Sequence, residues 1–261
     1  MSSPRIATLD IETTPILAYV WGLFKQFVGL NQIVADWSIL SFSYKWLGEK
    51  RVTHYNTGGR GVKNVRDDSQ LLKLLWKVLD EADIIVAQNG VKFDVKKINA
   101  RFIESGMPPP TPYKVIDTLL EAKKIAAFTS NRLAWLSEIL TDVPKSEHKK
   151  FPGIELWTES LADNPLAWAE MKKYNNIDVV ATEQVYLKLR PYIIGHPNVA
   201  TYNDDTAIQC PKCGSKKVQM RGKALTQTGE YKRFKCGGCG GWARSRYTSN
   251  TAEKRAALLS N

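Results

Sequence analysis

Apolar residues follow two different spacings along the first three quarters of the chain, and the two spacings alternate. The run Ile6–Ile11 has the pattern of a buried strand, and further strands are predicted over residues 38–46, 51–55, 83–87 and 113–117. Apolar residues that recur every three to four positions predict helices after Asp68, after Val91, over residues 133–140 and over residues 166–189. This alternation of strands and helices indicates an α/β fold.

Two local patterns refine this assignment. Residues 83–87 are almost entirely apolar, which is typical of a central strand covered on both faces. The segment Thr118–Glu121 has the residue types of a capping box, so Thr118 is expected to begin the helix that follows the strand ending at Asp117.

An insertion rich in aromatic residues separates the first two strands. Pro15–Trp21 is followed closely by Phe24, Phe27 and Val28. One interpretation is that this segment packs as a loop or short helix over one edge of the core, and the other is that its rings form a platform on which bases stack. We expect the first.

Composition sets the size of the protein and reveals an uneven charge. With 261 residues, 43% of them apolar, the chain can hold one sizeable core and a small module. Its net charge is +11, and the part from Thr201 onward contributes +8 of this, with twelve Lys and Arg against four Asp and Glu. Such an asymmetry points to nucleic acid or another polyanionic partner. No secretion signal and no membrane-spanning segment is recognised, so we expect a soluble protein.

Asp10 and Glu12 are two residues apart on the first predicted strand, so their side chains fall on one face of it. Two carboxylates held side by side repel each other unless a cation neutralises them. Oxygen ligands of this kind favour Mg²⁺ or Mn²⁺. A solvated strand end is the alternative, and the Asp-x-Glu pair alone does not decide between the two.

Two further positions combine acidic groups with a defined place in the predicted elements. Asp94 follows the turn Asn89–Gly90 and falls at a helix start, where ligands gather in α/β sheets; it could also simply favour the helix dipole. Tyr174 and Asp178 are four residues apart, so they share one face of a helix, either in a site or on the surface. Asp117 is expected to be structural rather than a metal ligand.

Taken together and in this order, three sequence patterns resemble the three exonuclease motifs of the DEDD superfamily, over roughly residues 5–190: Asp10-x-Glu12, Asn89-Gly90-x-x-Phe93-Asp94 and Tyr174-x-x-x-Asp178. The Tyr four residues before the last Asp resembles the tyrosine (DEDDy) subgroup, because the histidine subgroup would have His where this chain has Lys173. The superfamily, also described as DnaQ-like, includes proofreading domains of DNA polymerases. This chain looks most similar to stand-alone phage exonucleases and to the exonuclease domain of family B polymerases.

The resemblance implies a fold, a reaction and a set of site residues. The fold would be ribonuclease H-like, with a mixed central sheet flanked by helices. The reaction would be 3′-to-5′ hydrolysis to nucleoside 5′-monophosphates by a two-metal mechanism. The four carboxylates that would hold two Mg²⁺ or Mn²⁺ ions are Asp10, Glu12, Asp94 and Asp178.

Three other residues are given roles beside these ligands. Tyr174 would orient the attacking water or help to remove its proton, and Thr13 and Phe93 are expected to contact the terminal nucleotides. The expected substrate is single-stranded nucleic acid or a 3′ end, DNA being favoured over RNA. The expected setting is replication, proofreading or repair in the cytoplasm of a bacterium or a phage-infected host, and an RNA-trimming exoribonuclease is the alternative.

All four cysteines lie in two Cys-x₂-Cys pairs separated by 22 residues, at Cys210, Cys213, Cys236 and Cys239. Four thiolates at this spacing suit one structural Zn²⁺, and two disulfides are the alternative. The segment resembles a zinc ribbon, with strands expected over residues 217–221, 231–235 and 242–247. Its interleaved aromatic and basic residues are expected to bind nucleic acid through Lys232, Arg233, Trp242 and Arg244. Docking to a replication or repair protein through the ribbon or tail is the other interpretation.

The predicted organisation has four parts. A ribonuclease H-like exonuclease domain covers residues 1–195, followed by a linker over 196–207, a four-cysteine zinc ribbon over 208–248 and a basic tail over 249–261. A nucleic-acid-binding or adaptor protein on an exonuclease scaffold is the alternative to an active enzyme. The presence of all four acids and the Tyr favours the enzyme.

Overall fold

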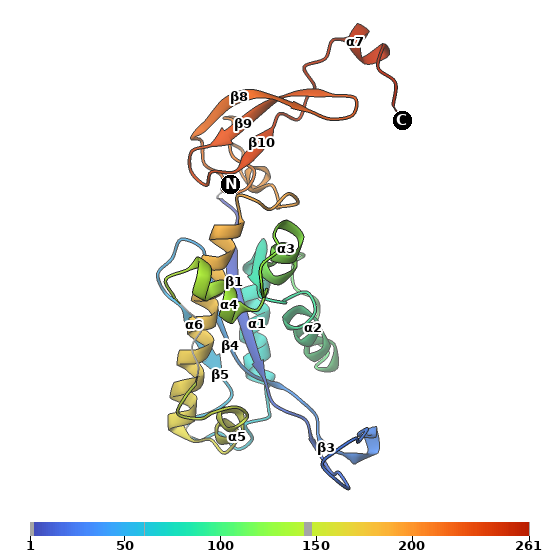
Figure 1. The fold of residues 1–261 in the computed structure, drawn as a ribbon. Coiled ribbons are helices and arrows are strands. Elements are labelled where there is room, and N and C mark those ends of the chain that lie inside the picture. Colours follow the sequence, from blue (N-terminus) through green and yellow to red (C-terminus); the bar gives the residue numbers. More distant parts are fainter. Residues whose placement is uncertain (1–2, 60, 144–147, 261) are drawn as a thin grey trace. The chain divides into compact units, whose positions relative to one another are not determined.

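The computed structural model describes residues 3–59, 61–143 and 148–260, which form two compact units. The larger unit is Arg5–Tyr186, and the smaller one contains the chain from Leu187 onward with the residues before Arg5. The larger unit contains a five-stranded sheet and the smaller one a three-stranded sheet (Figure 1). Among the described residues, no helix is both long enough and apolar enough to cross a membrane.

The sheet of the larger unit is mixed, with the strand order β5-β4-β1-β6-β7. Its strands are β1 (Ile6–Thr13), β4 (Ile39–Trp46), β5 (Thr53–Asn56), β6 (Ile84–Ala87) and β7 (Lys114–Asp117). Strand β1 is antiparallel to β4 and parallel to β6, and all four residues of β6 are buried. The predicted mixed central sheet is therefore confirmed.

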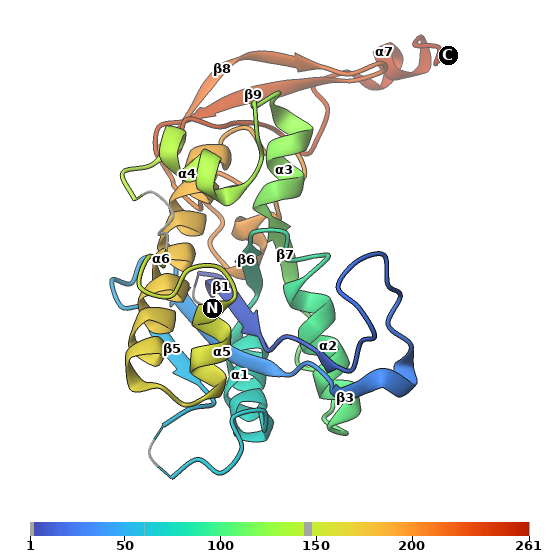
Figure 2. The same cartoon turned by 60° about the horizontal axis from the view of Figure 1, so that its bottom comes forward.

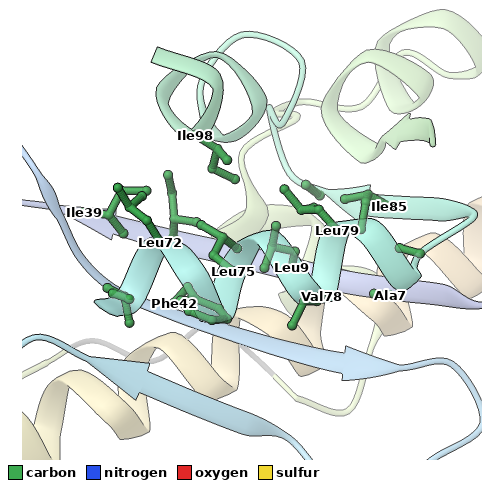
Figure 3. Close-up of a cluster of buried hydrophobic side chains, with 14 of the residues drawn as sticks. Ala7, Leu9, Ile39, Phe42, Leu72, Leu75, Val78, Leu79, Ile85 and Ile98 are labelled. Carbon is green, nitrogen blue, oxygen red and sulfur yellow. The ribbon is translucent and has the colours of Figure 1, made fainter. Parts of the chain in front are cut away.

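The main hydrophobic core lies between one face of this sheet and the helices α1 (Ser69–Glu81) and α2 (Asp94–Glu104). Figure 3 shows side chains of both helices and of β1, β4 and β6 gathered in one layer. Leu72 and Leu75 of α1 are fully buried there, and burial of each Leu stabilises the fold by about 1.5–3 kcal/mol. This core fixes the position of β1 and of the first turn of α2.

The opposite face of the sheet is covered by the long helix α6 (Pro165–Leu189) (Figures 1 and 2). Helix α5 (Glu155–Leu161) packs with α6 against Leu40 of β4 in a second apolar cluster. Helices α3 (Thr118–Ile125) and α4 (Leu133–Leu140) complete the larger unit. Helices therefore flank the sheet on both faces, as expected.

Most predicted elements of the larger unit agree with the structure to within three residues at each end. The helix expected after Val91 begins at Asp94, because residues 89–93 form turns. The predicted capping box is wrong by one position, since Asp117 is the N-cap of α3 and accepts hydrogen bonds from the backbone N–H groups of Leu119 and Leu120. Asp accepts these bonds as readily as Thr, and it is the residue in extended conformation here.

Residues 15–37 form an arm that stands away from the sheet in both views (Figures 1 and 2). The arm is built on two short antiparallel strands, β2 (Leu17–Ala18) and β3 (Ile33–Ala35), with a 3₁₀ turn at Leu30–Gln32. The expectation that it covers the core is wrong, because its large apolar side chains are exposed; Trp21 and Phe27 are 99% and 100% exposed. Apolar composition alone did not tell where these residues lie.

The smaller unit contains an antiparallel sheet in the order β10-β9-β8. Its strands are β8 (Val218–Leu225), β9 (Glu230–Cys236) and β10 (Trp242–Arg244). A 3₁₀ turn covers Val199–Tyr202, within the segment predicted as a linker, and the short helix α7 (Ala252–Ala256) lies in the predicted tail.

Candidate functional site

The side chains of β1 point alternately to the two faces of the sheet. Leu9 and Ile11 enter the main core, so Asp10 and Glu12 lie on the other face, the one covered by α6. Both acids are half-buried. The expectation that these two carboxylates share one face of a strand is thus met.

The pairing of β1 with β4 becomes irregular beside these acids. Glu12 pairs with Ser41 but Thr13 pairs with Ile39, so one residue of β4 is left without a partner. Such a bulge bends the strand and changes the direction in which neighbouring side chains point. Thr13, expected to contact the substrate, is half-buried at this bend.

Asp94 is held against β1 by its contact with the backbone. The pairing of β1 with β6 ends at Thr8, which leaves the next N–H groups on that edge of β1 without a strand partner. The Asp94 carboxylate fills this position, because its Oδ1 accepts a hydrogen bond of 3.1 Å from the N–H of Ile11. Asp94 is 2% exposed and lies in the first turn of α2, where the helix dipole also favours a carboxylate.

The turn before Asp94 needs the residues that occupy it. Asn89 has a φ of 62°, which Asn tolerates better than most residues. A Cβ on Gly90 would lie 2.5 Å from Cβ of Ala87, so only glycine fits there. The turn therefore brings the chain back from the end of β6 so tightly that α2 starts beside β1.

Asp117 fixes the same turn from the neighbouring strand. Its carboxylate accepts backbone hydrogen bonds from Asn89 (3.0 Å) and Val91 (3.1 Å) in the turn, in addition to those from the first residues of α3. Four N–H groups directed at one buried carboxylate describe a structural role. This agrees with the expectation for Asp117.

Burial dominates the electrostatics of Asp94. Removal from water disfavours the ionised form, the hydrogen bond from Ile11 opposes this effect, and the negative charge of Asp117 adds to it; the pKa of Asp94 is raised to about 7. A carboxylate that is costly to ionise in the protein alone gains free energy from a nearby cation. Asp94 therefore has the properties of a ligand for a metal ion.

Helix α6 brings the third motif to the same strand. Asn175 Nδ2 donates hydrogen bonds to Asp10, at 2.5 Å to the side-chain Oδ2 and 3.2 Å to the backbone carbonyl. Asn175 is fully buried. Asn175 was not predicted as a site residue, and its only signal in the sequence is its place between Tyr174 and Asp178 in the motif.

Tyr174 and Asp178, which flank Asn175 on α6, are 9% and 3% exposed, so neither is a surface residue. The Tyr174 ring centroid lies 5.1 Å from that of His148 and 6.2 Å from that of Trp157, both in edge-on arrangements. These rings restrict the orientation of the phenol.

Polar contacts fasten α6 to the sheet within the motif and after it. Lys45 of β4 forms an ion pair with Glu183, with Nζ 2.5 Å from Oε1. Ser43 Oγ lies 2.8 Å from Oδ1 of Asn176 and 2.9 Å from Nδ1 of His54 on β5. Burial of His54, reinforced by the positive charge of Lys172, lowers its pKa to about 4, so it is neutral at pH 7.

Phe93, expected to contact a nucleotide, is the N-cap residue of α2 and is 37% exposed. Lys97 Nζ lies 5.8 Å from its ring centroid and 3.5 Å from that of Trp37 at the base of the arm. The exposed ring of Phe93, the residue before Asp94, thus lies near the ammonium group of Lys97.

The four cysteines of the smaller unit meet in one cluster, with all four sulfurs within 4.8 Å of one another. The Cys210–Cys239 and Cys213–Cys236 sulfur distances are 3.7 and 3.6 Å, so no disulfide joins these pairs. Four sulfurs about 2.3 Å from one Zn²⁺ in a tetrahedron would be about 3.8 Å apart, close to these distances. The cluster could therefore hold a metal ion.

Cys236 also has the environment of a thiolate. Burial would raise the pKa of its thiol, but the backbone N–H groups of Cys239 and Gly238 point at the sulfur, at 3.4 and 3.2 Å, and the pKa is lowered to about 7. The nearby strands carry the predicted nucleic-acid contacts, which are all exposed: Lys232, Arg233, Trp242 and Arg244.

Parts of the chain are similar to known proteins. Residues 41–190 match the RNase H superfamily. The DNA polymerase III PolC-type of Ureaplasma parvum serovar 3 is 31% identical over 138 residues, which cover 48% of this chain and 9% of that protein. This chain thus spans less than a tenth of the length of this curated relative. The family B DNA polymerase from the hyperthermophilic archaeon Pyrobaculum calidifontis is 16% identical, with a TM-score of 0.49, over 74% of this chain and 26% of that one.

Proposed function

Since this chain belongs to the RNase H superfamily, we propose that it is a metal-dependent nuclease that removes nucleotides one at a time from the 3′ end of nucleic acid. The products are nucleoside 5′-monophosphates, and DNA is the favoured substrate over RNA. The three motifs assign it to the tyrosine subgroup of the DEDD exonucleases. It acts in replication, proofreading or repair, in the cytoplasm of a bacterium or of a phage-infected host.

One arrangement supports this proposal more than any other. The backbone N–H of Ile11 donates to Asp94, and the adjacent Asp10 accepts hydrogen bonds from Asn175. Two segments, around Asp94 and Asn175, which lie about 80 residues or more from β1 and from each other in the sequence, therefore contact two consecutive residues of β1. Each of these segments, and β1 itself, brings one or two carboxylates of the set that was selected from the sequence.

The donor set suits hard divalent cations. Asp10, Glu12, Asp94 and Asp178 offer carboxylate oxygens alone, which favour Mg²⁺ or Mn²⁺. Asp10, Glu12 and Asp178 would hold one ion, and Asp10 with Asp94 the other. When bound, such a pair would activate the attacking water and neutralise the charge that develops on the leaving 3′ oxygen.

The remaining residues orient the reactants. Tyr174 directs the attacking water through its hydroxyl or helps to remove its proton. Its ring is held by His148 and Trp157, so the direction of the hydroxyl is restricted. Thr13 and Phe93 contact the terminal nucleotides, Thr13 from the end of β1 and Phe93 by stacking beside Lys97.

The C-terminal cluster belongs to a separate module. Cys210, Cys213, Cys236 and Cys239 hold one structural Zn²⁺, which the observed sulfur distances support. The exonuclease domain covers residues 1–195, the linker 196–207, the zinc ribbon 208–248 and the basic tail 249–261. The ribbon or the tail is also where a replication or repair protein would dock.

The test is a cleavage assay on a 5′-labelled single-stranded DNA and on an RNA of the same sequence, with Mg²⁺ or Mn²⁺. A ladder that shortens from the 3′ end, with nucleoside 5′-monophosphates as products, is expected for DNA. Circular single-stranded DNA is the matched control and should remain intact because it has no end. Asp10→Ala should remove the activity without unfolding the protein.

Two results would contradict the proposal. Cleavage of the circular substrate would show an endonuclease, and wild-type activity in both Asp10→Ala and Asp178→Ala would show that the carboxylates are not the site. Tight binding of the oligonucleotide without any cleavage would favour the adaptor function instead.

A further inference from the structure

The three strands of the C-terminal sheet divide their side chains between two faces. In the register of β9 with β10, Lys235 is opposite Trp242 and Arg233 is opposite Arg244. Opposed residues share a face, and so do alternate residues along a strand. One face, here called the aromatic–basic face, therefore carries Tyr231, Arg233, Lys235, Trp242 and Arg244.

The contacts between these side chains agree with the register. The Arg233 guanidinium carbon lies 5.0 Å from the ring centroid of Trp242, and Lys235 Nζ lies 5.8 Å from the same centroid. The Arg244 guanidinium carbon lies 3.9 Å from the ring centroid of Tyr231. Cations that rest against rings in this way keep both groups at fixed positions on the surface.

The opposite face has a different character. It carries Phe234 and Ala243, which line a cavity together with Ile208, and it carries Lys232 opposite Lys223. The structure describes all three strands in full, and Glu230 is their single acidic residue. Glu230 pairs with Lys223, at 2.9 Å, on this second face. No carboxylate of the strands therefore neutralises the cations of the aromatic–basic face.

Four of the five positions on the aromatic–basic face are open to solvent, and Tyr231 is half-buried. Trp242 is 47% exposed, and Arg233, Lys235 and Arg244 are exposed. An indole that is exposed to this extent among three cations contributes little to the stability of a small sheet. A ligand that offers both flat apolar rings and negative charge would match it.

We propose that the aromatic–basic face is a binding surface for single-stranded nucleic acid, separate from the catalytic carboxylates. Bases stack on Trp242 and Tyr231, and phosphates pair with Arg233, Lys235 and Arg244. A duplex does not satisfy this surface, because the faces of its bases are covered by their neighbours in the stack. The inference rests on the proposed function only in taking nucleic acid as the substrate.

The strand register places Lys232 on the opposite face, so Lys232, which was predicted from the sequence to contact nucleic acid, is not part of the proposed surface. The opposite face therefore provides a control that is matched in charge. Arg233→Gln/Arg244→Gln and Lys223→Gln/Lys232→Gln each remove two positive charges from the same sheet, but from different faces. Trp242→Ala removes the exposed ring, and Trp242→Phe retains an aromatic ring. Zinc content, measured for each full-length variant, shows whether the ribbon remains folded.

The measurement is the fluorescence anisotropy of a labelled 20-nucleotide oligothymidine without added divalent ions, at several salt concentrations. The Arg233/Arg244 variant and Trp242→Ala should each raise Kd at least tenfold, while Trp242→Phe and the Lys223/Lys232 variant should change it less than threefold. The arginine variant should also reduce the slope of log K against log salt by about 1.4, for two lost phosphate contacts.

Equal weakening by the two double variants would overturn the inference, because it would show attraction by net charge without a preferred face. Unchanged binding in Trp242→Ala would overturn it as well, and equal competition by polyglutamate would indicate an acidic protein partner. These failures differ from failure of the proposed function, which is measured as absent cleavage and leaves binding by the ribbon intact.

Discussion

The backbone N–H of Ile11 donates its hydrogen bond to Oδ1 of Asp94, 83 residues further along the chain. Because Ile11 lies between Asp10 and Glu12, this bond places the Asp94 carboxylate, at the start of α2, against the segment of β1 that carries these two acids. The same carboxylate thus completes the edge of β1, and in the proposed metal site it would also contribute negative charge.

Substitutions at Asp94 should separate these two tasks. Asp94→Asn retains an oxygen acceptor for Ile11 but removes the charge, so cleavage should fall about 100-fold or more while the free energy of unfolding without metal ions stays the same or rises. Asp94→Ala also leaves the N–H of Ile11 buried without an acceptor, which should cost about 1–3 kcal/mol. Urea unfolding followed by tryptophan fluorescence and the cleavage rate measure the two effects. A destabilised Asp94→Asn protein would contradict this division of roles.

Asn175 should act through the position of Asp10. In Asn175→Ala, Asp10 loses the amide that holds it, so we expect a 10- to 100-fold loss of activity and a higher Mg²⁺ concentration for half-maximal rate. Asn176→Ala is the neighbouring control, because Asn176 bonds to Ser43 and not to an acid of the site. A rise in the Mg²⁺ requirement of equal size in both variants would show a general effect of loosening α6.

Asp117 should matter for stability. Asp117→Ala removes the acceptor of four backbone N–H groups in the turn and in the first turn of α3, so the free energy of unfolding should fall by about 2–4 kcal/mol. Asp117→Asn keeps one oxygen acceptor and should lose less. Urea denaturation of the two variants checks this order, and an equal loss in both would indicate that the charge, rather than the hydrogen bonds, matters.

His54 should make stability depend on pH. Its pKa is about 4 in the folded protein against 6.5 for an ordinary His, so the unfolded chain binds the proton first as the pH falls. The contribution is fully present above pH 6.5 and is lost progressively between 6.5 and 4. Between pH 7.5 and 5 the wild type should lose about 1–2 kcal/mol more than His54→Gln. Parallel unfolding curves at the two pH values measure the difference, which should vanish if His54 ionises normally.

The cysteine cluster should bind one metal ion per chain. Purified protein should contain one equivalent of zinc by atomic absorption, and Cys213→Ser should lose it because one thiolate of the four is missing. Ser215, two residues away, is the control position, and Ser215→Ala should retain the zinc. Full zinc content in Cys213→Ser would rule out a four-sulfur site.

The spacing of apolar residues predicted most of the larger unit, since periods of two and of three to four report which side of an element is buried. Strand β6 and helix α1 are examples. Each lies where the spacing of apolar residues predicts it, and each buries those apolar residues. Asp94 was also selected correctly as a residue at a helix start, since the turn residues Asn89 and Gly90 precede it.

Three features could not be predicted in the same way. Apart from its place between Tyr174 and Asp178, nothing in the local sequence marks Asn175, because its partner Asp10 is 165 residues away. Asp117 rather than Thr118 is the N-cap of α3. Both residue types favour this position, and the backbone conformation, which is extended at Asp117, determines which of them occupies it. Trp21 and Phe27 are of the residue types that usually form a core, but both are exposed. The identity of a side chain does not tell whether the fold places another surface against it.

The arm of residues 15–37 can be regarded as a removable module. The two strands that it joins are already closed by a backbone hydrogen bond of 2.9 Å from Thr14 to Ser38, and the exposed rings of the arm bury no surface in the core. A short turn between Thr14 and Ser38 would therefore leave the main apolar core intact. Any activity that the full-length protein has and the shortened protein lacks would then identify the function of these exposed side chains.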